Sequence, residues 1–139
     1  MVLLAAFNGA TQAQVEDILK KIVDCINREN DHFTLLAQRD KNEATLLELG
    51  FRPADVRRIV EEELTYEDYY RGPNPNGSSN VPPRLRSSDM WEFGKIVTGN
   101  KTMEVYIKFS FIEDSDCPFA CCVSFHEPDR TITCPLKES

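Results

Sequence analysis

The chain has 139 residues, of which 41% are hydrophobic and 28% are charged, and its formal net charge is −7. This length suits one domain and is too short for two, and the composition excludes a largely disordered chain. The negative charge argues against general nucleic-acid binding, because phosphate contacts need lysine and arginine. No apolar run reaches the roughly 18 residues of a membrane helix. The apolar start lacks the basic residues of a secretory signal. We expect one cytoplasmic domain over residues 1–139, with 1–10 as a loose tail.

The charge is uneven along the chain. Residues 1–70 carry 8 basic and 14 acidic side chains, whereas residues 71–108 carry 6 basic and 3 acidic ones. A small basic site on an acidic body is therefore compatible with this sequence.

The first predicted helix begins after Thr11. Apolar residues recur at helical spacing over 15–26, and Thr11 with Gln14 fits a capping box. We expect this helix to end near Asn30.

Further helical signals follow. Residues 42–49 predict a second helix that ends at Gly50, and Pro53 is a favoured first residue for a third helix. Residues 65–70 predict a short helical turn closed by Arg71 and Gly72. The segment Phe33–Arg39 fits a short strand or a bridge.

Residues 73–88 are predicted to form a loop, because they contain four prolines, a glycine and several Asn and Ser residues. A loop of this length is usually functional or disordered. Arg84 and Arg86 favour a contact with substrate, and a disordered connector is the alternative.

Strand signals dominate the last third of the chain. They cover Trp91–Val97, Met103–Ile112 and Phe119–Phe125, with Arg130–Cys134 as an expected edge strand before Pro135. Helices followed by a meander of strands predict an α+β fold, with N-terminal helices packed on a C-terminal antiparallel β-sheet.

Two of these strands alternate apolar and polar residues. Because successive side chains of a strand point to opposite faces, one face is predicted to be core and the other open. On residues 103–111 the apolar set faces the core, and the open face carries Glu104, Tyr106, Lys108 and Ser110. On residues 121–126 the same rule places Cys121, Val123 and Phe125 opposite Cys122, Ser124 and His126. If the strands pair, the residues that share the open face are Tyr106, Lys108, Ser124 and His126.

These side chains suit acid–base chemistry on an anion. Histidine is the side chain whose ordinary pKa lies nearest neutrality, so His126 is the first candidate for proton transfer. Tyr106 can donate to or accept from a reacting oxygen, and Lys108 can neutralise a phosphate. The simpler interpretation is a strand-end histidine beside an ordinary solvated sheet face.

A second group lies near the end of the short helical turn. Arg71 could bind a phosphate through two parallel hydrogen bonds, and Tyr70 could stack on an unpaired base. One of Tyr69 and Tyr70 is expected to fill the core instead. Glu92 could contact a base edge or act as a base, although an ordinary surface position is the simplest interpretation.

The cysteines number five, an odd count without an export signal, which favours reduced thiols that pack as small hydrophobes. The spacing fits zinc poorly. A minor alternative, a metal or thiol sensor, would use Cys117, Cys122, Cys134 and His126. Nucleotide-binding glycine loops, the nucleophile elbow and HExxH are absent from the sequence. We therefore expect no cofactor.

Five segments occur in a recognisable order: TYEDYYRGP, DMWEFGK, VYIKFSF, CVSFHEP and CPLK. This order resembles the MqsR family of bacterial toxins, which is similar to the wider RelE-like group of small ribonucleases. The similarity is best from about Asp40 to Lys137. It implies a RelE-like fold and a type II toxin that cleaves messenger RNA in the cytoplasm without a metal. It also implies a cognate antitoxin as partner. We expect no membrane contact, and no DNA binding except through the antitoxin complex.

The resemblance also assigns roles. Arg71 matches a basic residue, Tyr106 and Lys108 match a VYxK strand, and His126 stands where the best-known toxin has a lysine. The implied reaction is attack of an RNA 2′-hydroxyl on its own phosphate, with His126 and Tyr106 transferring protons in either order. Lys108 and Arg71 would stabilise the phosphorane. The expected substrate-binding residues are Glu92, Tyr70, Arg84, Arg86 and Ser124.

The chain departs from this pattern in its negative charge and at Glu92, where the best-known toxin has an amide. A carboxylate there would repel phosphate. The alternative is a catalytically weakened or inactive RelE-like module that acts by protein–protein interaction.

Overall fold

The computed structural model describes residues 9–28, 32–75, 88–113 and 118–137, and this part of the chain confirms the predicted α+β class. Its elements are α2 (Gln12–Asn27), β1 (Phe33–Leu35), α3 (Asp40–Leu49), α4 (Pro53–Glu62), the 3₁₀ turn η1 (Tyr66–Asp68), β2 (Tyr69–Pro75), β3 (Asp89–Thr98), β4 (Thr102–Ile112) and β5 (Phe119–His126). The sheet order is β1-β5-β4-β3-β2. Strand β1 runs parallel to β5, and the other pairs are antiparallel, so the sheet is mixed rather than purely antiparallel.

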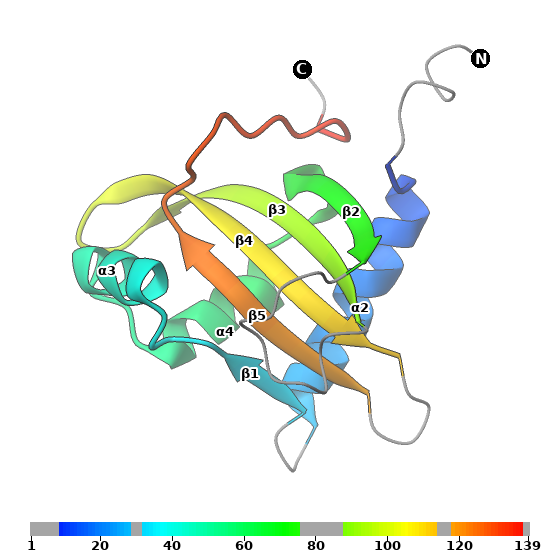
Figure 1. Ribbon diagram of the computed structural model, residues 1–139, viewed down its shortest axis with the longest axis horizontal. Helices are drawn as coiled ribbons and strands as arrows, with labels where there is room; N and C mark the ends of the chain where they lie inside the picture. Colours follow the sequence, from blue (N-terminus) through cyan, green and yellow to red (C-terminus); the bar gives the residue numbers. More distant parts are fainter. Residues whose placement is uncertain (1–8, 29–31, 76–87, 114–117, 138–139) are drawn as a thin grey trace.

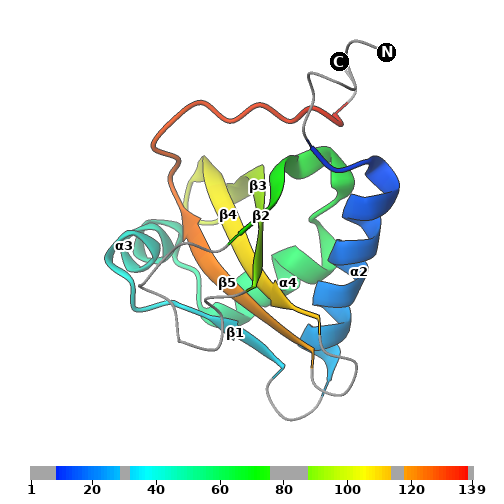
Figure 2. The same cartoon turned by 45° about the vertical axis from the view of Figure 1, so that its right-hand side comes forward.

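The helices occupy distinct places around the sheet (Figures 1 and 2). Figure 2 shows α2 and α4 together on one side of the sheet, where their apolar residues form the core with the inner faces of the strands. Helix α3 lies beside β5, and residues 127–137 run from the tip of β5 back past β4 and β3. The opposite face of β2 to β5 therefore faces away from α2 and α4. None of the helices in the described ranges is long and apolar enough to cross a membrane.

The ends of the helices follow the sequence signals. Thr11 Oγ accepts from the Gln14 amide at 3.2 Å, and Gln14 Oε1 accepts from the Thr11 amide at 2.9 Å, which completes the predicted capping box. Gly50 ends α3 with φ of 70°, and Pro53 is the first residue of α4, as predicted. Helix α2 ends at Asn27, three residues earlier than expected.

Strand β2 is the main element that the sequence did not predict. Residues 65–70 were expected to form a helical turn closed by Arg71 and Gly72, with a loop from residue 73. The turn ends at Asp68, and Tyr69–Pro75 pairs with β3 through two irregularities in register. Gly72 permits this pairing, since its φ is 119° and a Cβ there would lie 2.5 Å from the Met90 carbonyl oxygen. Tyr69 is fully buried, which confirms that one of the two tyrosines belongs to the core.

A bulge in β5 overturns part of the predicted alternation. The register shifts between Lys108 and Phe109, so that Val123 is an extra residue on β5. As a result Cys122 joins Phe125 in the core, whereas Cys121 and Val123 pack with Met90 on the other face. The predicted placement of Cys121, Cys122 and Val123 was therefore wrong, while that of Ser124 and His126 was right.

The expected edge strand at Arg130–Cys134 was also wrong. Residues 131–134 alternate between exposed and half-buried positions, but Arg130–Cys134 forms no ladder with the sheet. Ile132 lies over Gly94, where a Cβ would come within 2.6 Å of Ile132 Cγ2, so the segment crosses the face of the sheet rather than extending its edge.

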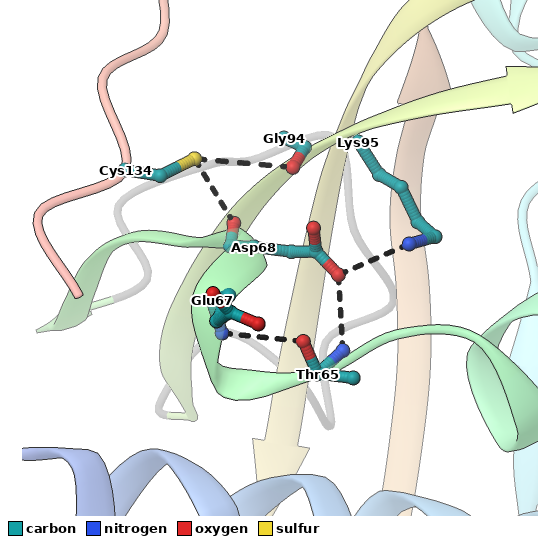
Figure 3. A network of polar contacts seen from close by, with 6 residues as sticks. All are labelled: Thr65, Glu67, Asp68, Gly94, Lys95 and Cys134. Carbon is teal, nitrogen blue, oxygen red and sulfur yellow. Dashed lines mark hydrogen bonds and ion pairs between the residues drawn. The ribbon is translucent and has the colours of Figure 1, made fainter. Parts of the chain in front are cut away.

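Polar contacts fix this C-terminal segment and η1 to β3 (Figure 3). The Cys134 thiol donates to the Asp68 carbonyl at 3.6 Å, and the Asp68 carboxylate accepts from the Thr65 amide at 3.0 Å and from Lys95 Nζ at 3.3 Å. The segment that follows β5 is thereby held across the open face of the sheet.

Candidate active site

A row of polar side chains crosses four strands on the open face. Arg71 of β2 pairs with Glu92 of β3, Glu92 pairs with Lys108 of β4, and Lys108 pairs with Ser124 of β5. Directly opposed residues in a sheet bring their Cβ atoms to about 5 Å, so neighbours in this row can interact.

A second row lies two residues further along the same face. Gly94 pairs with Tyr106, and Tyr106 pairs with His126. The rings of Tyr106 and His126 have centroids 5.5 Å apart. The predicted meeting of Tyr106, Lys108, Ser124 and His126 on one face is confirmed.

The two rows form the floor of a cavity of about 540 Å³. Its walls come from the residues before and at the start of α3 and from the C-terminal segment. The lining residues are Arg39, Lys41, Tyr70, Arg71, Asn74, Met90, Glu92, Tyr106, Lys108, Ser124, His126, Pro128, Asp129, Arg130 and Ile132. Five of these are lysine or arginine and two are carboxylates, so a local basic surface lies on an acidic protein.

Glu92 is the buried centre of the first row, with 5% of its surface exposed. Its Oε2 accepts from Arg71 Nε at 2.8 Å, and its Oε1 accepts a hydrogen bond from the Tyr106 hydroxyl. The interpretation of Glu92 as an ordinary surface residue was wrong. Its carboxylate is occupied by Arg71 and Tyr106, and it holds both side chains in the cavity.

The environment of Tyr106 keeps its phenol protonated. Burial raises the pKa of Tyr106, and the hydrogen bond to the Glu92 carboxylate raises it further. A phenol of this kind is a poor base at neutral pH, but it retains a proton to give to a strongly basic oxygen.

His126 is placed to accept a proton. Its Nδ1 lies 2.8 Å from the Glu127 carbonyl oxygen, which can only accept, so Nδ1 carries hydrogen and the neutral ring has its lone pair on Nε2. The side chain is 9% exposed and lines the cavity. This geometry favours His126 as a general base.

Lys108 is the central cation of the floor. Burial lowers the pKa of the Lys108 ammonium, while the charge of Glu92 on the neighbouring strand raises it. Within the described ranges Lys108 makes no salt bridge, in contrast to Arg71, which binds Glu92, and Lys41, which binds Asp129 at 2.6 Å. Its charge is therefore available to an anion in the cavity.

The remaining predicted binding residues fall into two groups. Tyr70 and Ser124 line the cavity, and the Arg71 guanidinium lies 4.9 Å from the Tyr70 ring centroid. Arg84 and Arg86 lie outside the described residues.

Sequence reasoning missed the walls of the cavity. Arg39, Lys41, Asp129 and Arg130 line it, but they lie outside the strands that drew attention to the face. Arg39 precedes a predicted helix, and helix N-termini attract anions, so that signal was present in the sequence.

The cysteines do not form the alternative metal site in the described ranges. Cys122 is in the core, Cys134 contacts Asp68, and Cys117 lies outside the described residues. Among the described residues, no group of three His, Cys, Asp or Glu side chains is placed to bind a metal ion. Burial raises the pKa of Cys121 to about 12 and that of Cys122 well above its usual range, so both thiols stay protonated and unreactive at neutral pH.

Comparison with known proteins identifies no relative: no family model, no curated protein and no solved structure matches the chain. A function for this chain must therefore be inferred mainly from the geometry of the cavity.

Proposed function

We propose that the chain is a metal-independent endoribonuclease that cleaves messenger RNA through its own 2′-hydroxyl, and that it acts as the toxin of a type II toxin–antitoxin pair. The observation that carries the proposal is the common cavity of His126, Tyr106 and Lys108, with a base, an acid and a cation on adjacent strands. The order of the sequence segments, which resembles the MqsR family, supports the same activity.

In this mechanism His126 Nε2 accepts the proton of the 2′-hydroxyl, and the 2′-oxygen attacks the adjacent phosphorus. The bond from phosphorus to the 5′-oxygen breaks, and Tyr106 gives its proton to that leaving oxygen. The products are a 2′,3′-cyclic phosphate and a free 5′-hydroxyl. The geometry thus favours one order of proton transfer, because Tyr106 is protonated and His126 has a free lone pair in the cavity.

Lys108 stabilises the extra negative charge of the phosphorane, as preorganised cations do in phosphoryl chemistry. Arg71 contributes less while Glu92 binds its Nε, although its remaining N–H groups can still donate. The two carboxylates among the described lining residues are already bound by basic side chains, which favours a reaction that uses protein cations rather than a carboxylate-held metal.

The second candidate is an inactive module that binds a partner protein. The observation in its favour is Glu92, whose carboxylate neutralises Arg71 and would oppose a phenolate on Tyr106. In either case the expected partner is an antitoxin encoded beside this chain.

The proposed activity is tested by incubating the purified protein with a defined RNA in EDTA and mapping the cut ends. We expect 2′,3′-cyclic phosphate and 5′-hydroxyl ends, no cleavage of DNA, and loss of cleavage in His126→Ala. The matched control is His32→Ala, since the His32 ring binds the Pro118 carbonyl and does not line the cavity. Equal cleavage by both variants, or none by the wild type, would refute the assignment.

A further inference from the structure

A second cavity of about 470 Å³ adjoins the candidate active site. It is lined by Arg39, Asp40, Lys41, Asn42, Ser124 and His126. Four of these residues also line the first cavity, so the two are continuous at Ser124 and His126.

The N-terminus of α3 forms one wall. The N-cap residue is Arg39, whose side chain makes no capping hydrogen bond, and the first amides of a helix have no acceptor within the helix. These amides and the helix dipole favour an anion at this position.

Asn42 fixes this helix end to the sheet. Its Nδ2 donates to the Leu36 carbonyl at 2.9 Å and to the Val123 carbonyl at 3.0 Å, and its Oδ1 accepts from the Phe125 amide at 2.9 Å. Because Asn42 is 1% exposed, the start of α3 is held rigidly beside Ser124 on β5.

Ser124 is the independent sign of a ligand. It is only 6% exposed, and within the described ranges its hydroxyl makes no hydrogen bond. No fully buried side-chain nitrogen or oxygen of the described residues lacks a partner, so this hydroxyl must reach the open space of the cavity. A buried hydroxyl that faces a hollow beside Arg39 is suited to donate to a phosphate oxygen.

Arg39 supplies the charge. Its guanidinium donates to the Val123 carbonyl at 3.4 Å and makes no salt bridge with a carboxylate of the described residues. Of the arginine and lysine side chains that line this second cavity in the described part of the chain, Lys41 is bound to Asp129, and Arg39 is the one whose charge is not taken up by a carboxylate.

We propose that Arg39, Ser124 and the first amides of α3 bind a second phosphate of the RNA strand, next to the scissile phosphate held at Lys108 and His126. This inference rests on the proposed ribonuclease function and adds to it a requirement for two neighbouring phosphodiesters. Arg39 is the charged side chain that contacts the second phosphate.

The test measures equilibrium binding of 2′-O-methyl RNA tetramers, which cannot be cleaved, with fluorescence anisotropy as the readout. One neutral methylphosphonate is placed at each linkage in turn. For the wild type we expect one linkage flanking the scissile position to weaken binding about tenfold when neutral, as loss of a charge-assisted hydrogen-bond pair implies.

In Arg39→Gln the unmodified tetramer should bind about tenfold more weakly. The same methylphosphonate should then weaken binding much less than in the wild type, because only the Ser124 hydroxyl and the α3 amides still contact that phosphate. The slope of log K against log salt should fall by roughly 0.7, the value for one phosphate contact on a single strand. Ser124→Ala, which removes only the hydroxyl, should show a smaller loss at the same linkage. Arg28→Gln, at the exposed end of α2, is the matched control and should bind as the wild type does.

Equal costs of the methylphosphonate in the wild type and in Arg39→Gln would overturn the second site. Inorganic phosphate added to ¹⁵N-labelled protein separates this failure from that of the ribonuclease proposal, because it needs no RNA. Shifts of the Asp40–Asn42 amides that disappear in Arg39→Gln support the second site even if no RNA is cleaved. Shifts confined to amides near Lys108 on β4 contradict the second site even if RNA is cleaved.

Discussion

Replacing Glu92 by glutamine removes a single negative charge from the floor of the cavity and keeps the size of the side chain. Glu92 now holds Arg71 Nε and the Tyr106 hydroxyl, and its charge raises the pKa of Tyr106. The amide should leave more of the Arg71 charge for the phosphate and make Tyr106 a stronger acid. We therefore expect Glu92→Gln to bind RNA more tightly and to cleave it faster.

The magnitude follows from simple electrostatics. Two like charges about 6 Å apart repel by roughly 3 kcal/mol at an effective dielectric constant of about 20. The Arg71 guanidinium, bound to the same carboxylate, cancels part of this repulsion, so we take about 1.4 kcal/mol, which is a tenfold change. The exchange also weakens two charge-assisted hydrogen bonds, and we expect the free energy of unfolding to fall by about 1–2 kcal/mol.

The assay is binding of 2′-O-methyl RNA and single-turnover cleavage of the matching RNA, with stability taken from urea titration. The control is Glu104→Gln, which changes the net charge equally at an exposed position of the same sheet face, outside this cavity. Tighter binding in Glu92→Gln but not in Glu104→Gln supports the reasoning. Unchanged or weaker binding in Glu92→Gln would refute the view that this carboxylate opposes the phosphate.

Three further predictions concern stability, each measured by urea titration. Lys108→Met should raise the free energy of unfolding at pH 7, because burial lowers the pKa of Lys108 and the charged native form is penalised. As the pH rises through the lowered pKa of native Lys108 toward the ordinary value of 10.5, the native wild type loses this proton and no longer bears the cost of a buried charge. The gain in the free energy of unfolding should therefore shrink, and a gain that stays constant with pH would contradict this reasoning. Gly94→Ala should lower the free energy of unfolding by about 1–3 kcal/mol and speed proteolysis after Arg130, because the new Cβ would clash with the Ile132 side chain. Asn42→Ala should lower the free energy of unfolding by about 1–3 kcal/mol, because the Phe125 amide loses its acceptor while the Leu36 and Val123 carbonyls keep only their contacts with Arg39. A loss below about 1 kcal/mol would show that water replaces the Asn42 side chain.

The elements that the sequence predicted well are those with local signals. The capping box at Thr11, the stop at Gly50 and the start at Pro53 depend on residues within one helical turn. The face shared by Tyr106 and Lys108 follows from period-two alternation on a regular strand.

The elements that were missed depend on long-range pairing. Strand β2 forms because Gly72 lets the backbone approach Met90, and no local pattern in residues 69–75 indicates that partner. The bulge at Val123 reverses the faces of Cys121 and Cys122, and a one-residue shift of this kind is not visible in an alternating sequence.

The residues on the floor of the candidate site were predicted, but their contacts with one another and the walls of the cavity were not. Glu92 was identified as a polar strand residue, yet its contacts with Arg71 and Tyr106 require the register of three strands. Arg39 enters the cavity because Asn42 joins α3 to β5 across more than 80 positions of sequence. Contacts of this range come from tertiary structure alone.

The central claim is that this cavity holds a ribose–phosphate linkage and moves protons on and off its oxygens. It is tested most directly with an RNA that carries a single 2′-deoxy nucleotide on the 5′ side of a mapped cut. We predict that cleavage stops at that linkage and continues at the others. Cleavage at the 2′-deoxy linkage at an unchanged rate would contradict the mechanism, because no 2′-hydroxyl would be present for His126 to activate.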